Sequence, residues 1–280
     1  MSTAAGSTRQ PKPLPTEEEA SSRAAKARAA HFNYVLALAD DALVLGHRLS
    51  EWSGQGPLLE EDIALSNLAL DLIGQARLFY AYAGEIEGSE NGGGRDEDAL
   101  AYRRDEHAFA NVLLVEQPNG DFAATMVRQL IYAAFMHPFF QALAKSGDPR
   151  LAGIGAKAEK EMAYHLRHAA EWVIRLGDGT EESHARAAAA LDELWAYTGE
   201  LFAMDETERT LVADGIAVDR AAVKPHWQAT IDRVLREATL ETPADGWMQG
   251  GGRAGRHTEH LGHLLAEMQV LHRAHPGAVW

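Results

Sequence analysis

Three long stretches of this 280-residue chain contain no proline, and they restrict its fold more than any other feature. They cover residues 16–56, 58–117 and 150–224 and are rich in Ala, Leu, Glu and Arg. These residue types lose little side-chain freedom in a helix, whereas proline removes a backbone donor and clashes with the preceding turn. Runs of this length and composition therefore predict long α-helices.

Segments rich in glycine, proline and small polar residues mark the expected ends of these helices. They are 50–57, 88–94, 117–121, 145–150, 175–180 and 246–255, and they separate about seven or eight helices. Within the helices, apolar residues recur at steps of three or four, as at Leu65, Leu68 and Leu72, which places them on one face. No segment of comparable length alternates with period two. The sequence therefore predicts an all-α domain of long antiparallel helices, one of which, from about Phe122 to Lys145, is expected to kink at Pro138.

The two ends of the chain differ from this pattern. Residues 1–30 lack the apolar core of a secretory signal and are expected to form a disordered lead before a single domain at 31–280. The glycine-rich segment 246–255 is the best candidate for a mobile loop before the last helix, and the absence of a preceding strand disfavours a phosphate-binding role. No stretch approaches the roughly 18 to 20 uninterrupted apolar residues of a membrane helix, so a cytoplasmic protein is expected.

Charge and cysteine content exclude several functions. The chain has 26 Lys and Arg against 41 Asp and Glu, a formal charge of −15, which disfavours nucleic acid as a partner. It contains no cysteine, so that disulfides, thiolate metal sites and a cysteine nucleophile are excluded. It also lacks the G-x-S-x-G motif of serine hydrolases. Metal chemistry would therefore have to use His, Asp and Glu.

A bundle of long helices with internal acids and histidines suggests a di-iron carboxylate site as a hypothesis. Such a site takes Glu-x-x-His from each of two helices, because this spacing puts both ligands on one inward face. The chain has one such pair, Glu181 and His184, directly after Thr180. Acidic residues are common at helix starts, where Thr180 is a plausible cap, so this pair is interpreted as structural. The sequence does not supply the usual ligand set.

Polar residues nonetheless lie on the apolar faces of three predicted helices. They are Asp40 and His47, then Asp71 and Gln75, then Glu161, His165 and His168. One interpretation is a degenerate metal or substrate site. The other, which we favour, is a buried hydrogen-bonded network in which each charge has a partner.

The C-terminal segment adds a histidine cluster and arginines. A zinc site on one helix is strained there because His257 and His263 diverge around the helix axis, although Glu259 with His260 stays open as a partial ligand pair. Arginines that could bind an anionic ligand are Arg103, Arg104, Arg253 and Arg256. Solvated ion pairs are the alternative interpretation of these arginines.

Five long strings identify a family resemblance. The chain resembles the PaaC family, the C-type subunits of the bacterial 1,2-phenylacetyl-CoA epoxidases or phenylacetate-CoA oxygenases, from about Asn33 to its C-terminus. The strings are LSEWSGQGPLLEEDIALSNLALDLIGQARLFYAYA, RRDEHAFANVLLVEQPNGDF, EKEMAYHLRHAAEWVIRLGDGT, ADGIAVD and HTEHLGHLLAEMQVLHRAHPGAVW. Long collinear strings of this kind are far more specific than a short motif.

The resemblance implies a ferritin-like helical bundle with additional C-terminal helices. It implies a non-catalytic structural subunit of a ring-epoxidising monooxygenase of aerobic phenylacetate breakdown. A homologous catalytic subunit would hold the di-iron centre, and a reductase component with NADPH, flavin and an iron–sulfur cluster would supply electrons. No cofactor and no catalytic residue are expected in this chain, which has Gly74 three residues after Asp71 and Met162 three before His165.

The resemblance also implies a contact with phenylacetyl-CoA through two short segments. The substrate-binding residues implied are Ala108, Phe109, Ala110, Asn111, Arg209, Thr210 and Leu211. Phe109, Asn111 and Arg209 have the side chains suited to specific contacts, and a packing role for Phe109 is an equal alternative. Two other functions stay open: a self-sufficient ferritin-like metal-dependent oxidase and an acyl-CoA-binding module.

Overall fold

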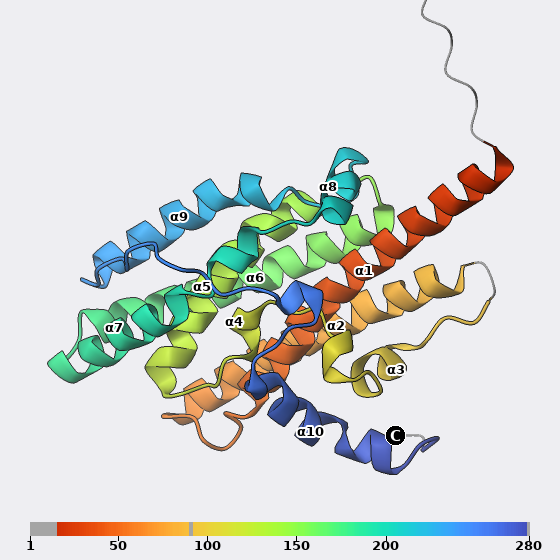
Figure 1. Cartoon of the computed structure of the whole chain (residues 1–280). Coiled ribbons are helices and arrows are strands. Elements are labelled where there is room, and N and C mark those ends of the chain that lie inside the picture. Colours follow the sequence, from red (N-terminus) through yellow and green to blue (C-terminus); the bar gives the residue numbers. More distant parts are fainter. Residues whose placement is uncertain (1–15, 90–91, 279–280) are drawn as a thin grey trace, which may run out of the picture.

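The chain folds as a set of packed helices in a computed structural model, which describes residues 16–89 and 92–278. These residues contain helices and connecting segments and no strand, which confirms the all-α prediction (Figure 1). The α-helices are α1 (Glu17–Ser50), α2 (Leu59–Gly88), α3 (Glu97–Tyr102), α4 (Leu113–Glu116), α5 (Phe122–Leu143), α6 (Pro149–Gly177), α7 (Glu181–Trp195), α8 (Glu206–Ala213), α9 (Arg220–Glu237) and α10 (Glu259–Ala274). Short 3-10 helices are η1 (Glu106–Ala108), η2 (Gly199–Phe202) and η3 (Gly252–Ala254).

Four long helices form the bundle expected of a ferritin-like protein. Helix α1 packs along α2, and α5 packs along α6, each pair being joined by a short turn that makes its members antiparallel. The indole Nε1 of Trp52, just after α1, donates to Thr125 Oγ1 near the start of α5 at 3.0 Å, which joins the two pairs. Helices α7 and α9 cover α5, α8 packs on α1, and α10 lies at the edge of the molecule next to α3 (Figure 1).

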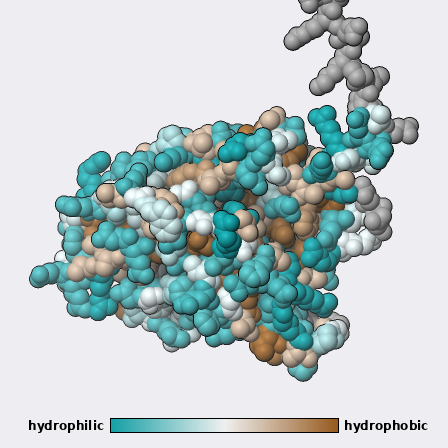
Figure 2. Space-filling view, in the orientation of Figure 1, coloured by the Kyte–Doolittle hydropathy of each residue, from teal (hydrophilic) through white to brown (hydrophobic). Residues whose placement is uncertain are grey.

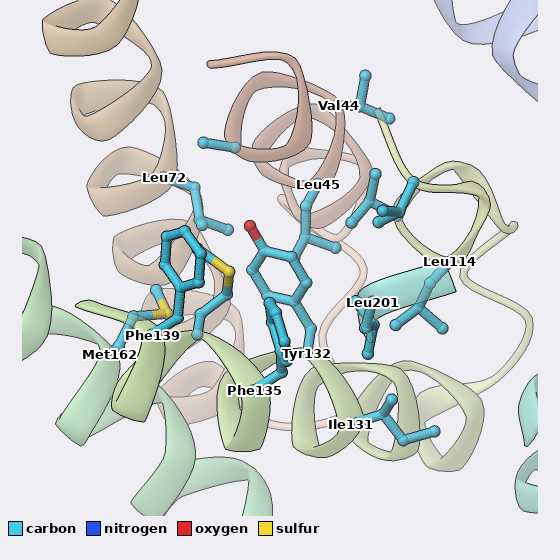
Figure 3. Close-up of a cluster of buried hydrophobic side chains, with 14 of the residues drawn as sticks. Val44, Leu45, Leu72, Leu114, Ile131, Tyr132, Phe135, Phe139, Met162 and Leu201 are labelled. Carbon is cyan, nitrogen blue, oxygen red and sulfur yellow. The ribbon is translucent and has the colours of Figure 1, made fainter. Parts of the chain in front are cut away.

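The four helices bury one continuous apolar core. Figure 3 shows Leu45 of α1, Leu72 of α2, Phe139 of α5 and Met162 of α6 directed toward one another, and all four are buried. Burying each such side chain contributes about 1.5–3 kcal/mol. This packing is the main reason that the bundle holds together.

Polar side chains cover most of the face of the molecule that Figure 2 displays. Teal, hydrophilic residues dominate this view, and brown, hydrophobic residues are visible only in small areas between them. This distribution is expected when the apolar stripes of the helices are turned inward.

Helix α1 begins earlier than the sequence analysis placed the domain. Thr16 caps α1 in a capping box with Glu19, and the helix continues from Glu17 through residue 30, where the lead was predicted to end. The cap and the following Ala- and Arg-rich residues satisfy the first turns locally, so residues 17–30 are helical. The rest of the predicted lead, residues 1–15, lies outside the described residues.

Other helix boundaries lie close to the predicted ones. Helix α5 starts at Phe122, as predicted, continues through Pro138, and ends at Leu143 rather than at Lys145. Thr180 caps α7 as expected, through a reciprocal pair of hydrogen bonds with Ser183. Across 16–89 and 92–278, no helix is both long and apolar enough to cross a membrane.

Candidate functional site

The polar residues on the apolar faces of α2 and α6 form separate pairs. Gln75 Nε2 donates to Glu161 Oε2 at 2.9 Å, and His165 Nε2 lies 3.1 Å from Asp71 Oδ2. His168 of α6 is paired in the same way with Glu61 of α2, at 2.8 Å. Side-chain pairing was the interpretation that the sequence analysis favoured over a metal site, but the contacts are separate pairs rather than one network, and His47 Nε2 is buried with no hydrogen-bond partner among the described residues.

The inward positions of α2 and α6 carry few metal ligands. Leu72 and Gln75 of α2 are 0% and 1% exposed, whereas a side chain at Gly74 would extend into open space. On α6, Met162 and His165 are buried. The sequence analysis measured α2 against a Glu-x-x-His pair at Asp71 and Gly74, but the helical repeat turns Leu72 and Gln75 inward there and leaves Gly74 on the outer side.

The donor set does not fit a di-iron group. In the part of the chain that the structure describes, no three His, Asp or Glu side chains are placed to hold a metal ion. The isolated Glu-x-x-His pair has other roles, since Glu181 is exposed in the first turn of α7 and His184 Nδ1 lies 2.7 Å from the carbonyl oxygen of Gly177. Leu72, Phe139 and Met162 instead fill the space between the helices (Figure 3).

A cleft of about 630 Å³ lies outside the bundle, between α1 and three later segments. Residues 30–37 of α1, 107–110, 199–211 and 249–255 supply most of its wall. Figure 1 shows the last of these segments as the blue stretch of chain that crosses the bundle between α9 and α10. Alanine and glycine supply many of the lining residues, and most of the lining surface is apolar.

Two adjacent acids on α1 position the wall formed by residues 107–110. Asp40 accepts from Tyr80 Oη at 2.6 Å and from the backbone N of Ala110 at 2.8 Å, and it forms a buried ion pair with Arg104. Asp41 accepts from the backbone N of Val112 at 2.8 Å. Both carboxylates are buried on α1, so they need hydrogen-bond donors. The donors come from the loop after η1, and these bonds fix that loop against α1.

The glycine-rich wall is fixed in the same manner, contrary to the expectation of a mobile loop. Buried Glu200 accepts from the backbone N of Gly251 at 2.9 Å and of Leu113 at 2.8 Å. Arg253 donates to the carbonyl oxygens of Ala37 and Ala110 at 3.0 and 2.7 Å, and it reaches Asp41 Oδ2 at 2.5 Å. These bonds join the wall to α1, α4 and η2, which are distant in sequence.

Glycine is required in this wall for close backbone approach. A Cβ atom at Gly252 would lie 2.1 Å from the carbonyl oxygen of Asn111, a distance at which the backbones must separate. Gly255 has a φ of +72°, in the left-handed region that glycine adopts most readily. Composition alone suggested flexibility here, whereas these glycines allow a tight fit.

Both arginines in the cleft wall are already paired. Arg220 Nε lies 2.5 Å from Glu208 Oε1, and Arg253 is paired with Asp41. Burial raises the pKa of the Asp41 carboxyl, and although burial lowers the pKa of Arg253, its pairing with Asp41 outweighs this and raises it. Burial also raises the pKa of the Tyr34 hydroxyl to about 12. The wall therefore offers no unpaired arginine, and its acids Glu200 and Asp205 accept backbone N–H groups.

The structure brings together only part of the residues implied as substrate-binding. Ala108, Phe109, Ala110 and Leu211 line the cleft, although residues 108–110 and 211 are far apart in sequence. The ring of Phe109 is buried, with the Arg104 guanidinium 4.1 Å from its centroid.

The other three implied residues lie outside the cleft lining. Asn111 is buried and donates through Nδ2 to Glu116 Oε2 at 3.1 Å. Arg209 is exposed and lies 3.4 Å from Glu206, whose carbonyl oxygen accepts from Thr210 Oγ1 at 3.0 Å.

Sequence reasoning did not identify the acids that organise the cleft. Asp41, Glu116 and Glu200 each accept backbone N–H groups from segments that are distant in sequence. No sequence motif indicates this role. The one available signal was the pair Asp40 and Asp41 within the apolar run ALADDALVL, where a buried acid needs a partner.

One C-terminal histidine, His257, joins the hydrogen bonds that fix the cleft walls. His257 is buried, with Nδ1 3.0 Å from Glu116 Oε2 and Nε2 2.9 Å from the carbonyl oxygen of Phe109. Burial lowers its pKa, but the hydrogen bonds to these two acceptors outweigh burial and raise the pKa above the ordinary value. A ring with acceptors at both nitrogens is satisfied only in its protonated form.

Comparison with known proteins gives two findings. A sequence model of the family described as "Phenylacetic acid catabolic protein" matches residues 4–280. The chain is also 49% identical over 247 residues to a protein of Escherichia coli (strain K12) whose name identifies it as the C subunit of 1,2-phenylacetyl-CoA epoxidase. That alignment covers 88% of this chain and 98% of the relative.

Proposed function

The chain belongs to the phenylacetic acid catabolic protein family, and from this premise we propose that it is the C subunit of a 1,2-phenylacetyl-CoA epoxidase. In this role it assembles in the cytoplasm with the other components of the enzyme. The identity of 49% over nearly the full length of the relative supports the assignment.

The interior of the bundle supports a structural role without a metal centre of its own. Leu72, Phe139 and Met162 occupy the space between the long helices, and the nearby acids and histidines are used in pairs. The di-iron centre belongs to the homologous catalytic subunit, whereas the reductase component supplies electrons from NADPH through flavin and an iron–sulfur cluster. This chain stabilises the catalytic subunit, to which it adds surface for the substrate.

The cleft is the part of this chain that supports contact with the acyl-CoA. Its volume of about 630 Å³ lies in the range of small-molecule sites, and its wall contains residues 108–110 and Leu211. The paired arginines leave little positive charge inside, so the apolar wall suits the thioester arm better than the phosphates. Arg209 is exposed and can meet a phosphate group from outside the cleft.

Co-expression tests the structural role. The catalytic subunit is produced with and without this chain, and its solubility, iron content and phenylacetyl-CoA epoxidation are measured with the reductase present. We expect the catalytic subunit to be soluble and active only with this chain. Equal activity of the catalytic subunit when this chain is omitted would contradict the proposal.

A cleft-filling substitution tests the substrate contact. Ala108 is exposed and lines the cleft, so Ala108→Trp should weaken phenylacetyl-CoA binding by the assembled complex at least about 10-fold without opening the core. The control, Ala189→Trp, places the same side chain on the outer side of α7, outside the cleft. Unchanged calorimetric affinity in Ala108→Trp would remove the cleft from the binding site.

An acyl-CoA-binding module that acts without an oxygenase is the second candidate, and the cleft is the observation that favours it. The two functions differ in what the partner does. If the purified chain binds phenylacetyl-CoA tightly and the catalytic subunit neither binds it nor depends on this chain, the module is correct and the structural role is wrong.

A further inference from the structure

The polar side chains of the cleft wall differ in whether the protein already uses them. The arginines, acids, tyrosine and histidine of the wall all contact a hydrogen-bonding partner. Three others line the cleft and form no side-chain hydrogen bond with any residue that the structure describes: Asn33, Thr207 and Gln249. Asn33 of α1 and Thr207 of α8 are exposed, whereas Gln249 is half-buried. In a mainly apolar cleft, such unused polar groups are available to orient a ligand.

The two carboxamides reach the cleft from different parts of the fold. Asn33 lies one turn before Ala37 on α1, and both residues line the cleft. Gln249 belongs to the glycine-rich wall, and its backbone N donates to the carbonyl oxygen of Ala196 at 2.7 Å, which fixes the start of that wall. Each carboxamide has two N–H donors and one carbonyl acceptor. Together they suit a ligand that carries uncharged amide groups along an apolar chain.

Arg256 lies against the same wall and differs from the other arginines near the cleft. A Cβ atom at Gly251, which lines the cleft, would lie 2.9 Å from Arg256 Nε and 3.1 Å from Nη2, so the guanidinium rests on this glycine. Arg256 is exposed, and no carboxylate within the described residues pairs with it. Arg209, by contrast, lies 3.4 Å from Glu206. The Arg256 guanidinium is therefore available to an anion at the edge of the cleft.

We propose that the cleft binds the acyl-CoA in one fixed direction, an inference that rests on the proposed function. Asn33 and Gln249 hydrogen-bond the amide groups of the pantetheine arm inside the cleft, and Arg256 binds the phosphates of the CoA nucleotide at its edge. The ligand has the same order of groups, because its arm carries two uncharged amides and the phosphates come after them. No phosphate has to enter the cleft, whose own arginines are already paired with Asp41 and Glu208.

An extended peptide of a partner protein would also offer amides to the two carboxamides. The unpaired guanidinium of Arg256 favours the acyl-CoA, because a peptide backbone is uncharged and gives an arginine no anion to bind. Removing the charge of Arg256 therefore separates the two kinds of ligand.

Calorimetry with two ligands tests the direction of binding. The complex with the catalytic subunit is titrated with phenylacetyl-CoA and with phenylacetyl-pantetheine, which keeps both amides and lacks the nucleotide phosphates. Asn33→Leu and Gln249→Met remove the carboxamides at similar side-chain size, and each should weaken the binding of both ligands by about 3- to 10-fold. Arg256→Gln should weaken phenylacetyl-CoA binding about 10-fold and leave phenylacetyl-pantetheine binding unchanged.

Matched controls change the same residue types outside the cleft lining. Gln55→Met lies in the turn after α1 and Arg236→Gln lies on α9; both residues are exposed, and neither variant should change the affinity for the two ligands.

Three results would overturn the proposal: equal weakening of both ligands by Arg256→Gln, unchanged affinities in the two carboxamide variants, or no binding of phenylacetyl-pantetheine by the original complex. If phenylacetyl-CoA still binds and Ala108→Trp still weakens it, the proposed substrate contact stands and the direction of binding alone is wrong. If phenylacetyl-CoA does not bind to the complex, both are wrong.

Discussion

Replacing Arg253 with methionine removes one ion pair that holds the cleft together. Methionine retains much of the apolar stem, but it leaves the Asp41 carboxylate, which is buried, without the cation 2.5 Å away. The bonds from Arg253 to the carbonyl oxygens of Ala37 and Ala110 are lost as well. Breaking a buried pair in this way costs about 3–5 kcal/mol, and the partial exposure of Arg253 favours the lower end, about 3 kcal/mol.

Urea unfolding followed by circular dichroism measures this loss. We compare Arg253→Met, Asp41→Asn and the double variant, in which no buried charge is left unpaired. The double variant should lose at least about 1 kcal/mol less than the sum of the single variants. A loss below about 1 kcal/mol for Arg253→Met, or strictly additive losses, would refute the argument that the pair fixes the glycine-rich wall.

Two histidines and a glycine give further predictions. The pKa of His257 is raised in the fold, so protonated His257 adds its full contribution to the free energy of unfolding below about pH 6.5. This contribution is lost as the pH rises through the folded pKa, so His257→Gln should flatten the decrease in the free energy of unfolding measured between about pH 6 and 9. Burial lowers the pKa of His47 to about 4, so the fold should lose about 2 kcal/mol between about pH 7 and 5 as the unfolded state takes up the proton, and His47→Phe should remove this loss in urea titrations at both pH values. Gly252→Ala should lower the melting temperature measured by calorimetry by several degrees because its Cβ would lie 2.1 Å from a carbonyl oxygen, whereas Gly246→Ala in the same segment meets open space and should change little. Equal effects at the two glycines, or pH profiles that the histidine substitutions leave unchanged, would contradict these arguments.

The helices could be predicted because their signals are local. Long proline-free runs, apolar steps of three and four, and the cap at Thr180 all act within one or two turns. The same local signal was missed at Thr16, where a capping box starts α1 inside the predicted lead. Residues 16–30 lie inside the proline-free run 16–56 but contain no large apolar residue, so the segment was assigned to the lead.

The cleft could not be predicted because it depends on contacts between distant residues. Ala37, Ala110 and Arg253 meet only after three parts of the chain have folded around α1. The family resemblance implied two of the cleft segments, but it gave no means of separating lining residues from Asn111, which is buried against Glu116. Likewise, periodicity indicated that Asp71 and Gln75 share a face, whereas their partners on α6 became known only from the packing.

Metal analysis of the separated components tests the central claim, that this chain is a structural member of the oxygenase. The complex with the catalytic subunit is assembled, its epoxidation of phenylacetyl-CoA is confirmed, and the two proteins are then separated and analysed for iron. The account predicts that the iron stays with the catalytic subunit; this chain should hold only a substoichiometric amount, because apolar side chains fill the interior of its bundle. Two irons bound to this chain in isolation, with oxidation of the substrate when the catalytic subunit is omitted, would contradict it.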